Sequence, residues 1–136
     1  MPAFRAVWAI RVVADAAALD AAAWTEPEIG QVTVLRVAPD EAIAINALAA
    51  EVPDGDAIAT QEGGLVVGHC SLDEIERFLE WPLPVQRPAF AQGAIAGVPV
   101  RLMLDGSDQV AVYTWAAYAD DLAAKLGWAR LPRWLP

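Results

Sequence analysis

The residue pair most suggestive of chemistry is His69-Cys70, because a histidine next to a cysteine can act as the base for a thiolate nucleophile. Neighbouring residues in an extended segment point to opposite sides, so these two side chains would need an unusual backbone to share a proton. Cysteine is also commonly a small buried hydrophobic residue. The sequence therefore favours packing, and we expect alanine at either position to leave any activity of an assembled system within a few-fold.

Carboxylates occur in neighbouring pairs, which could supply the acid and the base of a hydrolase. The pairs are Asp40-Glu41, Asp73-Glu74 and Asp120-Asp121. Each is expected in a turn or at the start of a helix, where capping and the helix dipole already favour acidic side chains. We interpret them as solvated surface groups.

The residue types of this chain give little support for a metal site or a phosphate site. One cysteine and one histidine cannot supply the three or four Cys/His ligands of a zinc site. Gly93 and Gly97 bracket a stretch that resembles a phosphate loop only superficially, because the lysine, the Ser/Thr and the following helix are missing. We therefore assign no catalytic residue, no metal ligand and no cofactor-binding residue, and interpret this stretch as the start of a strand.

The overall charge argues against nucleic acid as a partner. The 136 residues carry 18 acidic and 9 basic side chains, a net charge of −9, which opposes a phosphate backbone. The longest uncharged stretch, Pro88 to Val100, contains prolines and is shorter than the ~20 residues of a membrane-spanning helix. Arg5 and Arg11 interrupt the first apolar run, so no signal-peptide pattern is found. With no disulfide possible from one cysteine, we expect a cytoplasmic protein.

Alternating apolar residues and turn residues predict antiparallel strands joined in hairpins. A further pair of strands is expected to flank a turn at Gln61-Glu62-Gly63, whose glycine permits positive φ. The expected strands cover residues 4–13, 32–37, 42–46, 56–60, 64–68, 94–104 and 110–113.

Three helices are expected to back these strands. The first runs over residues 15–24 with Asp15 as its cap, and the second over 71–80, where Ser71 and Glu74 have the spacing of a capping box. The third covers 115–126 with Thr114 as its cap, Tyr118, Leu122 and Leu126 on its apolar face and Gly127 at its end. Hairpins alternating with helices predict a single α+β domain over residues 1–136.

In two segments the large apolar side chains do not recur at the spacing of a helix or a strand, so we expect no local core to receive them. They are Trp81–Phe90 and the tail, residues 128–136, and both are rich in aromatic residues and arginine but lack lysine and glutamate, as interface centres do. A tail folded back over its own domain is the alternative, but we expect truncation after Gly127 to leave a folded chain and weaken assembly. The candidate partner-binding residues are Trp81, Arg87, Phe90, Trp128, Arg130, Arg133 and Trp134.

Three motifs give the chain a family resemblance. They are VLRVAPDEAIAI (34–45), GLVVGHCSLDEIERFL (64–79) and AIAGVPVRLMLDGSDQVAVYTWAAYADDLAAKL (94–126). Over about residues 33–127 the chain resembles the gamma subunit of heterotetrameric sarcosine oxidase, a small relative of the aminomethyltransferase (glycine-cleavage T-protein) fold. It departs from that family in its shorter N-terminus, in Ala38 where glycine is common, and in WAAYA at the start of the last helix.

The resemblance implies a structural role in a larger assembly. It suggests a non-catalytic accessory subunit of a flavin- and folate-linked amine-oxidising complex, in which the larger partner subunits hold the flavin and the folate and this chain holds no cofactor. Two other hypotheses stay open: a stand-alone, folate-type small-molecule binder that could be a homodimer, and an enzyme using His69 or a carboxylate pair.

Overall fold

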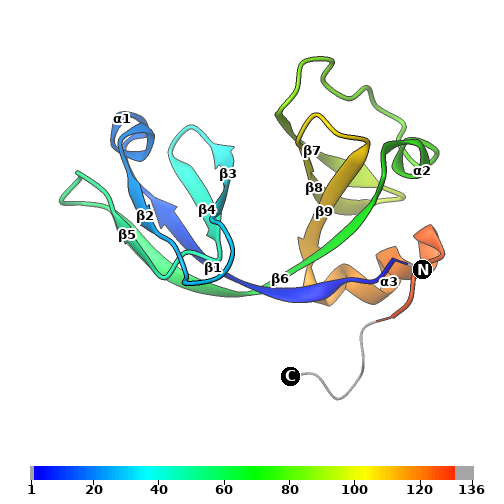
Figure 1. The fold of residues 1–136 in the computed structure, drawn as a ribbon, viewed down its shortest axis with the longest axis horizontal. Helices are drawn as coiled ribbons and strands as arrows, with labels where there is room; N and C mark the ends of the chain where they lie inside the picture. The colour runs from blue at the N-terminus through cyan, green and yellow to red at the C-terminus, as the bar shows by residue number, and fades with distance from the viewer. Residues whose placement is uncertain (1, 131–136) are drawn as a thin grey trace. The chain divides into compact units, whose positions relative to one another are not determined.

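The computed structural model describes residues 2–130 and groups the chain into two compact units. The N-terminal unit is Val7–Gly63, and the C-terminal unit combines Met1–Ala6 with Gly64–Pro136. In sequence, the boundaries of the units fall within strands β1 (Arg5–Val13) and β6 (Ile58–Ser71), which Figure 1 labels. The single domain expected over residues 1–136 stays a prediction.

The N-terminal unit is built on a hairpin with a strand beside it. Strands β3 (Thr33–Ala38) and β4 (Glu41–Ile45) pair antiparallel across the expected Pro39-Asp40 turn, and β1 pairs antiparallel with the other side of β4. Alternate side chains of these strands pack with Leu19 of helix α1 (Ala16–Asp20) into a small, alanine-rich core.

The first helix is shorter than the sequence predicts. It ends at Asp20, and the following Ala23–Thr25 forms strand β2, which pairs with β5 (Ala49–Glu51). Asp15 occupies the cap position, but its side chain makes no capping hydrogen bond. Alanine is the strongest helix former, but intrinsic propensity is a weak preference, and here pairing with β5 overrides it.

The expected hairpin around Gln61-Glu62-Gly63 is wrong. Residues 58–71 form the single strand β6, which passes through both Gly63 and Gly64 without turning. Neither glycine adopts a positive φ. Glycine permits a turn but does not require one, and here the apolar residues on both sides continue into one strand.

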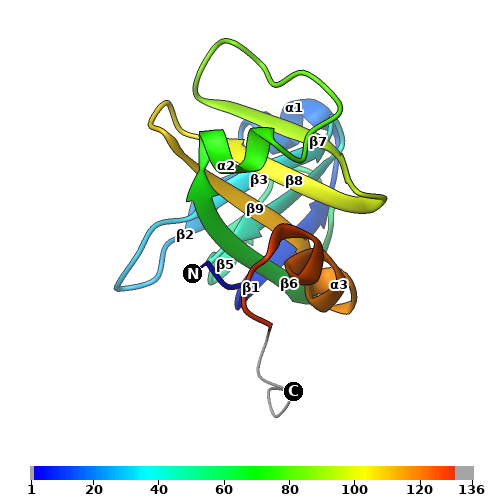
Figure 2. The same cartoon turned by 90° about the vertical axis from the view of Figure 1, so that its right-hand side faces the viewer.

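The C-terminal unit is an antiparallel sheet with two helices on one face. The strand order is β6-β9-β8-β7, with β7 covering Ala89–Ile95, β8 Val98–Leu104 and β9 Gln109–Trp115. Helices α2 (Leu72–Glu76) and α3 (Ala116–Leu126) lie against this sheet (Figure 2). Ile75 and Leu122 of the helices are fully buried in one core with Leu102 and Val112 of the sheet. The expected hairpin of β8 and β9 is confirmed. The single strand expected over residues 94–104 is wrong, because a turn at Ala96-Gly97 divides it and the residues before that turn end the separate strand β7.

Helix α2 begins where the capping box predicts. The Ser71 hydroxyl accepts a hydrogen bond from the Glu74 N–H at 3.1 Å. The helix ends at Glu76, four residues earlier than expected, and the Glu74 side chain does not return to the cap. Its carboxylate instead accepts a hydrogen bond from the indole of Trp128.

We expect Ser71→Ala to lower the free energy of unfolding by about 1 kcal/mol, because it removes the side-chain acceptor of this cap. Ser71→Asn keeps a capping oxygen and should stay close to the wild type. Urea unfolding of the three proteins measures the difference, and equal stability of the alanine and asparagine variants would contradict a capping role.

Helix α3 has the expected end but a different start. Gly127 closes it in the left-handed conformation, with φ at 74°. Trp115 is the N-cap residue, while the hydroxyl of the predicted cap, Thr114, donates to the Pro99 carbonyl at 2.9 Å. Tyr118 is 43% exposed, so it does not share the buried face of Leu122.

Strands in antiparallel hairpins and three helices together make the described chain a strand-rich α+β structure.

Within residues 2–130, no helix has the length and apolar character needed to cross a membrane.

Candidate functional site

His69 and Cys70 point to opposite sides of strand β6, as their adjacency predicts. His69 is exposed, whereas Cys70 is 4% exposed and belongs to the core of the C-terminal unit. Burial, with the nearby Glu74 charge, raises the pKa of the Cys70 thiol to about 12. A thiol protonated at neutral pH is a poor nucleophile, so this geometry supports the packing interpretation.

We expect the folded protein to react only slowly with a thiol reagent such as 5,5′-dithiobis(2-nitrobenzoic acid) at pH 8, because the thiolate fraction at Cys70 is small and the sulfur is buried. Addition of urea should raise the rate to that of a free cysteine. Rapid reaction of the folded protein would contradict this expectation and would make Cys70 a candidate nucleophile again.

The paired carboxylates make structural contacts. Glu41 accepts a hydrogen bond from Arg11 at 2.9 Å, and Glu74 accepts one from Trp128 at 3.0 Å. Asp121 contacts Lys125 one helical turn away in α3. Each pair thus has one member in a hydrogen bond or ion pair within the fold. Glu41 and Glu74 are half-buried, so these two are not the solvated groups that the sequence predicts.

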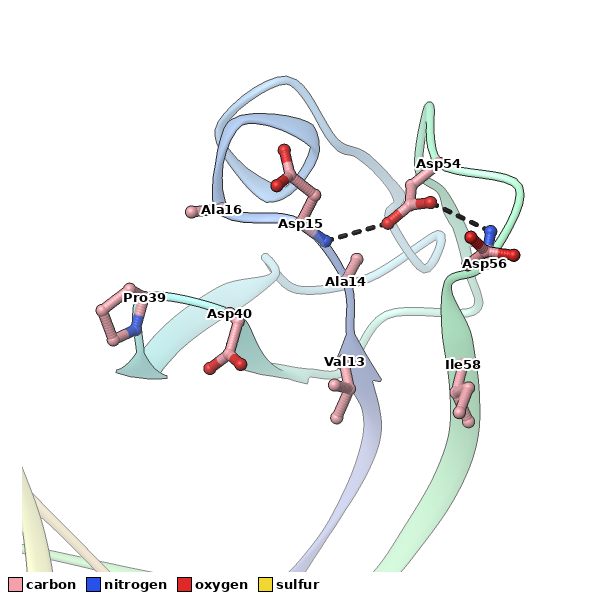
Figure 3. A pocket seen from close by; sticks show the side chains of 9 residues that line it. All are labelled: Val13, Ala14, Asp15, Ala16, Pro39, Asp40, Asp54, Asp56 and Ile58. Carbon is pink, nitrogen blue, oxygen red and sulfur yellow. Dashed lines mark hydrogen bonds between the residues drawn. The ribbon is translucent and has the colours of Figure 1, made fainter.

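An open pocket of about 670 Å³ in the N-terminal unit gathers four aspartates (Figure 3). Asp15 and Asp40 come from the ends of β1 and of the β3–β4 turn, and Asp54 and Asp56 from the connector before β6. Exposed Ile58 is among its apolar lining residues. The residues lining the pocket are Val13, Ala14, Asp15, Ala16, Pro39, Asp40, Asp54, Asp56 and Ile58.

The aspartates of this pocket also stabilise its loops. Asp54 accepts the backbone N–H of Asp15 and that of Asp56, each at 2.9 Å, and these hydrogen bonds lower the pKa of its carboxyl group. In residues 2–130 no group of three or more His, Cys, Asp or Glu side chains has the arrangement of a metal site. The pocket favours cationic groups over anions. This pocket was not predicted from the sequence, although the run Asp54-Gly55-Asp56 indicates an acidic loop in the connector.

The candidate residues Trp81, Arg87 and Phe90 lie close to or on strand β7. Trp81 is half-buried: its indole N–H donates to the Ala94 carbonyl at 2.9 Å, and its ring lies over Gly93. Arg87 is also half-buried and donates to the Val85 carbonyl. Phe90 lies in β7 opposite Met103 of β8. These three residues therefore share one edge region of the C-terminal unit, and their role in binding a partner stays a prediction.

The interpretation of Trp128 as a residue without a local core is wrong. Its side chain is 6% exposed, its ring centroid lies 4.8 Å from that of Phe4, and its indole N–H donates to Glu74 at 3.0 Å. The ring also lies directly over Gly68, where a Cβ atom would come within 2.3 Å of Trp128 Cζ3. Trp128 is thus a core residue, as the alternative of a folded-back tail implies.

The remaining candidate residues of the tail are Arg130, Arg133 and Trp134. Arg130 is exposed. Arg133 and Trp134 lie outside the described residues, so their predicted role in partner binding rests on the sequence alone.

Charge is unevenly divided between the two units. Residues 7–63 hold ten acidic and two basic side chains, whereas the rest of the chain holds eight acidic and seven basic ones. The N-terminal unit therefore carries nearly all of the net negative charge, and the C-terminal unit is close to neutral.

Comparison with known proteins shows a structural likeness. No protein-family model matches the sequence, and no curated protein matches it. A chain of the solved structure of heterotetrameric sarcosine oxidase from Corynebacterium sp. U-96, in complex with pyrrole 2-carboxylate, is similar in fold, with a TM-score of 0.57 at 16% sequence identity. The match covers 96% of this chain and 88% of that chain. The likeness concerns the fold and is nearly end to end.

Proposed function

We propose that this chain is a non-catalytic accessory subunit of a flavin- and folate-linked amine-oxidising complex, in the position of the sarcosine oxidase gamma subunit. The observation that carries the proposal is the nearly end-to-end fold match with a chain of a heterotetrameric sarcosine oxidase. An aminomethyltransferase-like fold, larger partner subunits that hold flavin and folate, and a cytoplasmic location belong to the same proposal.

The side chains that could do chemistry support this assignment. Burial keeps the thiol of Cys70 protonated at neutral pH, and Glu41, Glu74 and Asp121 each contact a side chain that stabilises the fold. An enzyme using these groups would have to break these contacts during its reaction. A structural subunit needs no such change.

The charge of the pocket disfavours the stand-alone folate-type binder. Folate-type molecules carry carboxylates, and the pocket presents Asp15, Asp40, Asp54 and Asp56. Like charges repel one another. The pocket therefore offers an anionic ligand little attraction.

The test is affinity purification of the tagged full-length chain from its native host. We expect larger chains in fixed stoichiometry, flavin absorbance in the recovered complex, and oxidation of a secondary amine such as sarcosine. A chain that is recovered alone and binds folate in calorimetry would instead support the stand-alone binder. Recovery alone without folate binding would contradict both functions.

The variants His69→Ala and Cys70→Ala extend this test to the chemistry. If the chain is a structural subunit, the recovered complex should keep its turnover within a few-fold in both variants. A thousandfold loss of turnover with assembly intact would place a catalytic group in this chain.

A further inference from the structure

The chain contains two Asp-Gly pairs, Asp54-Gly55 and Asp105-Gly106. In such a pair the backbone nitrogen of the glycine can attack the aspartate carboxyl group, because glycine has no side chain to hinder the approach. Both pairs lie in connections outside the helices and strands, the first before β6 and the second between β8 and β9. The sequence alone therefore does not separate them, but the hydrogen bonds of the two carboxylates do.

The carboxylate of Asp54 is held by two separate segments of the N-terminal unit. Its Oδ2 accepts the backbone N–H of Asp15, 39 residues earlier, and its Oδ1 accepts that of Asp56, each at 2.9 Å. Attack at Cγ needs one of the two oxygens to leave, so one of these hydrogen bonds has to break. Asp54 is also half-buried. These contacts protect its carboxyl group from the reaction.

Both hydrogen bonds to the Asp105 side chain end on one oxygen. Its Oδ1 accepts the backbone N–H of Ser107 at 2.9 Å and the Ser107 hydroxyl at 2.6 Å. Two donors on Oδ1 stabilise the negative charge that develops there when a nucleophile attacks Cγ, as in an oxyanion hole. Among residues 2–130 no group donates to Oδ2, and Asp105 is exposed, so Oδ2 can take a proton from water and leave.

We propose that Asp105-Gly106 is a modification site at which the chain converts spontaneously to isoaspartate, in preference to Asp54-Gly55. The Gly106 nitrogen attacks Cγ of Asp105, and the new C–N bond replaces the bond from Cγ to Oδ2. The amide proton of Gly106 and the carboxyl hydroxyl group leave together as one water molecule, and a five-membered imide remains.

A second water molecule opens the imide in one of two ways. Addition at Cγ restores aspartate, whereas addition at the main-chain carbonyl carbon of Asp105 leaves the backbone running through Cβ and Cγ. One water is lost and one is gained, so the step needs no oxidant, reductant or other co-reactant. The reacting atoms all belong to two adjacent residues of one unit, and the inference does not use the proposed function.

The isoaspartate lengthens the connection between β8 and β9 by one backbone carbon. This connection also holds the start of helix α2, because the Asp108 carbonyl accepts the N–H of Leu72 at 2.7 Å. Leu104 and Val110, which pair across the end of the hairpin, are both buried. The modification should therefore loosen the end of this hairpin and the first turn of α2.

The test is incubation of the full-length chain at neutral pH, with samples digested by trypsin over several weeks. Trypsin places the two pairs on different peptides, residues 37–77 and 102–125. Isoaspartate changes the retention of a peptide without changing its mass, and it resists endoproteinase Asp-N, which cleaves before aspartate. We expect it to accumulate at Asp105 at least about fivefold faster than at Asp54, the effect of one hydrogen bond that has to break. In urea this difference should disappear.

Three variants identify the groups that take part. Ser107→Ala removes the hydroxyl donor and should slow the reaction at Asp105 about threefold or more. Ser107→Thr keeps a hydroxyl group and is the matched control. Asp105→Glu would have to close a six-membered ring, so the isoaspartate in residues 102–125 should be lost, which excludes Asp108 as its source. In the modified wild-type chain, the Leu72 amide should exchange its hydrogen faster than in the unmodified chain.

Equal or faster accumulation at Asp54 would overturn the inference. A difference between the two sites that persists in urea would do the same, because the folded structure would then not be its cause. So would the absence of isoaspartate from the folded chain over a period in which the unfolded chain forms it. An unchanged rate in Ser107→Ala would contradict the role of the two donors on Oδ1, and unchanged exchange at Leu72 would contradict the effect on α2.

Discussion

Replacing Gly68 with alanine should lower the free energy of unfolding by about 3 kcal/mol, the upper end of the usual cost of overpacking a core. The added Cβ would lie 2.3 Å from Trp128 Cζ3 and 3.2 Å from Phe4 Cδ1. The indole cannot simply move aside, because its N–H is bonded to Glu74 and its other neighbours belong to the buried core. The strand backbone itself accepts alanine, so the loss measures the contact with the two rings.

Gly63→Ala is the matched control for this measurement. Gly63 lies in the same strand, and no atom lies within 4 Å of the position that an added methyl group would take. The substitution should therefore change stability by less than about 0.5 kcal/mol. Urea unfolding followed by circular dichroism compares the two variants. Equal stability of both would mean that the Trp128 ring does not lie on β6 in solution.

Trp128→Ala should cost about 3–5 kcal/mol, the range measured for removal of a large aromatic side chain from a core. It removes the contact with Phe4, uncovers Gly68 and leaves Glu74 without its indole donor. Truncation after Gly127 removes the same side chain and should be at least as harmful. The sequence-based expectation that this truncation leaves a folded chain is therefore replaced by its opposite.

Thermal and urea unfolding of Trp128→Ala and of the truncated chain test this result. Trp8→Ala removes the same side chain from a position that is 47% exposed, and should cost clearly less. If the truncated chain unfolds like the wild type, the ring is not part of the core. Removal of residues 131–136 alone tests the separate prediction that Arg133 and Trp134 bind a partner, with co-purification as the readout.

Local signals predicted those parts of the fold that depend on neighbouring residues. The β3–β4 and β8–β9 hairpins follow from alternation and turn residues, and the caps at Ser71 and Gly127 follow from side-chain and backbone chemistry within one helical turn. The errors arose where distant residues decide. The alanine-rich segment after Asp20 becomes a strand because Ala49–Glu51 pairs with it.

For the candidate sites too, local signals predicted some features and contacts between distant residues decided the others. Opposite orientations of His69 and Cys70 follow from their adjacency in a strand. The pocket of aspartates joins loops separated by up to about forty residues, so the local run Asp54-Gly55-Asp56 marks one of its loops but does not predict the pocket as a whole. The residues around Trp128 do not mark it as a core residue either, because its contacts, Phe4 and Gly68, lie far away in the sequence.

The contact of Phe4 with Trp128 also has a consequence for synthesis of the chain. Trp128 is made 124 residues after Phe4, which at 5–20 residues per second is a delay of roughly 6 to 25 s. The N-terminal unit is continuous in sequence and can fold during this time, whereas the C-terminal unit still lacks the ring that covers Phe4 and Gly68. Until then the nascent chain exposes an apolar surface beside its first strand, and such surface promotes aggregation of an incomplete chain.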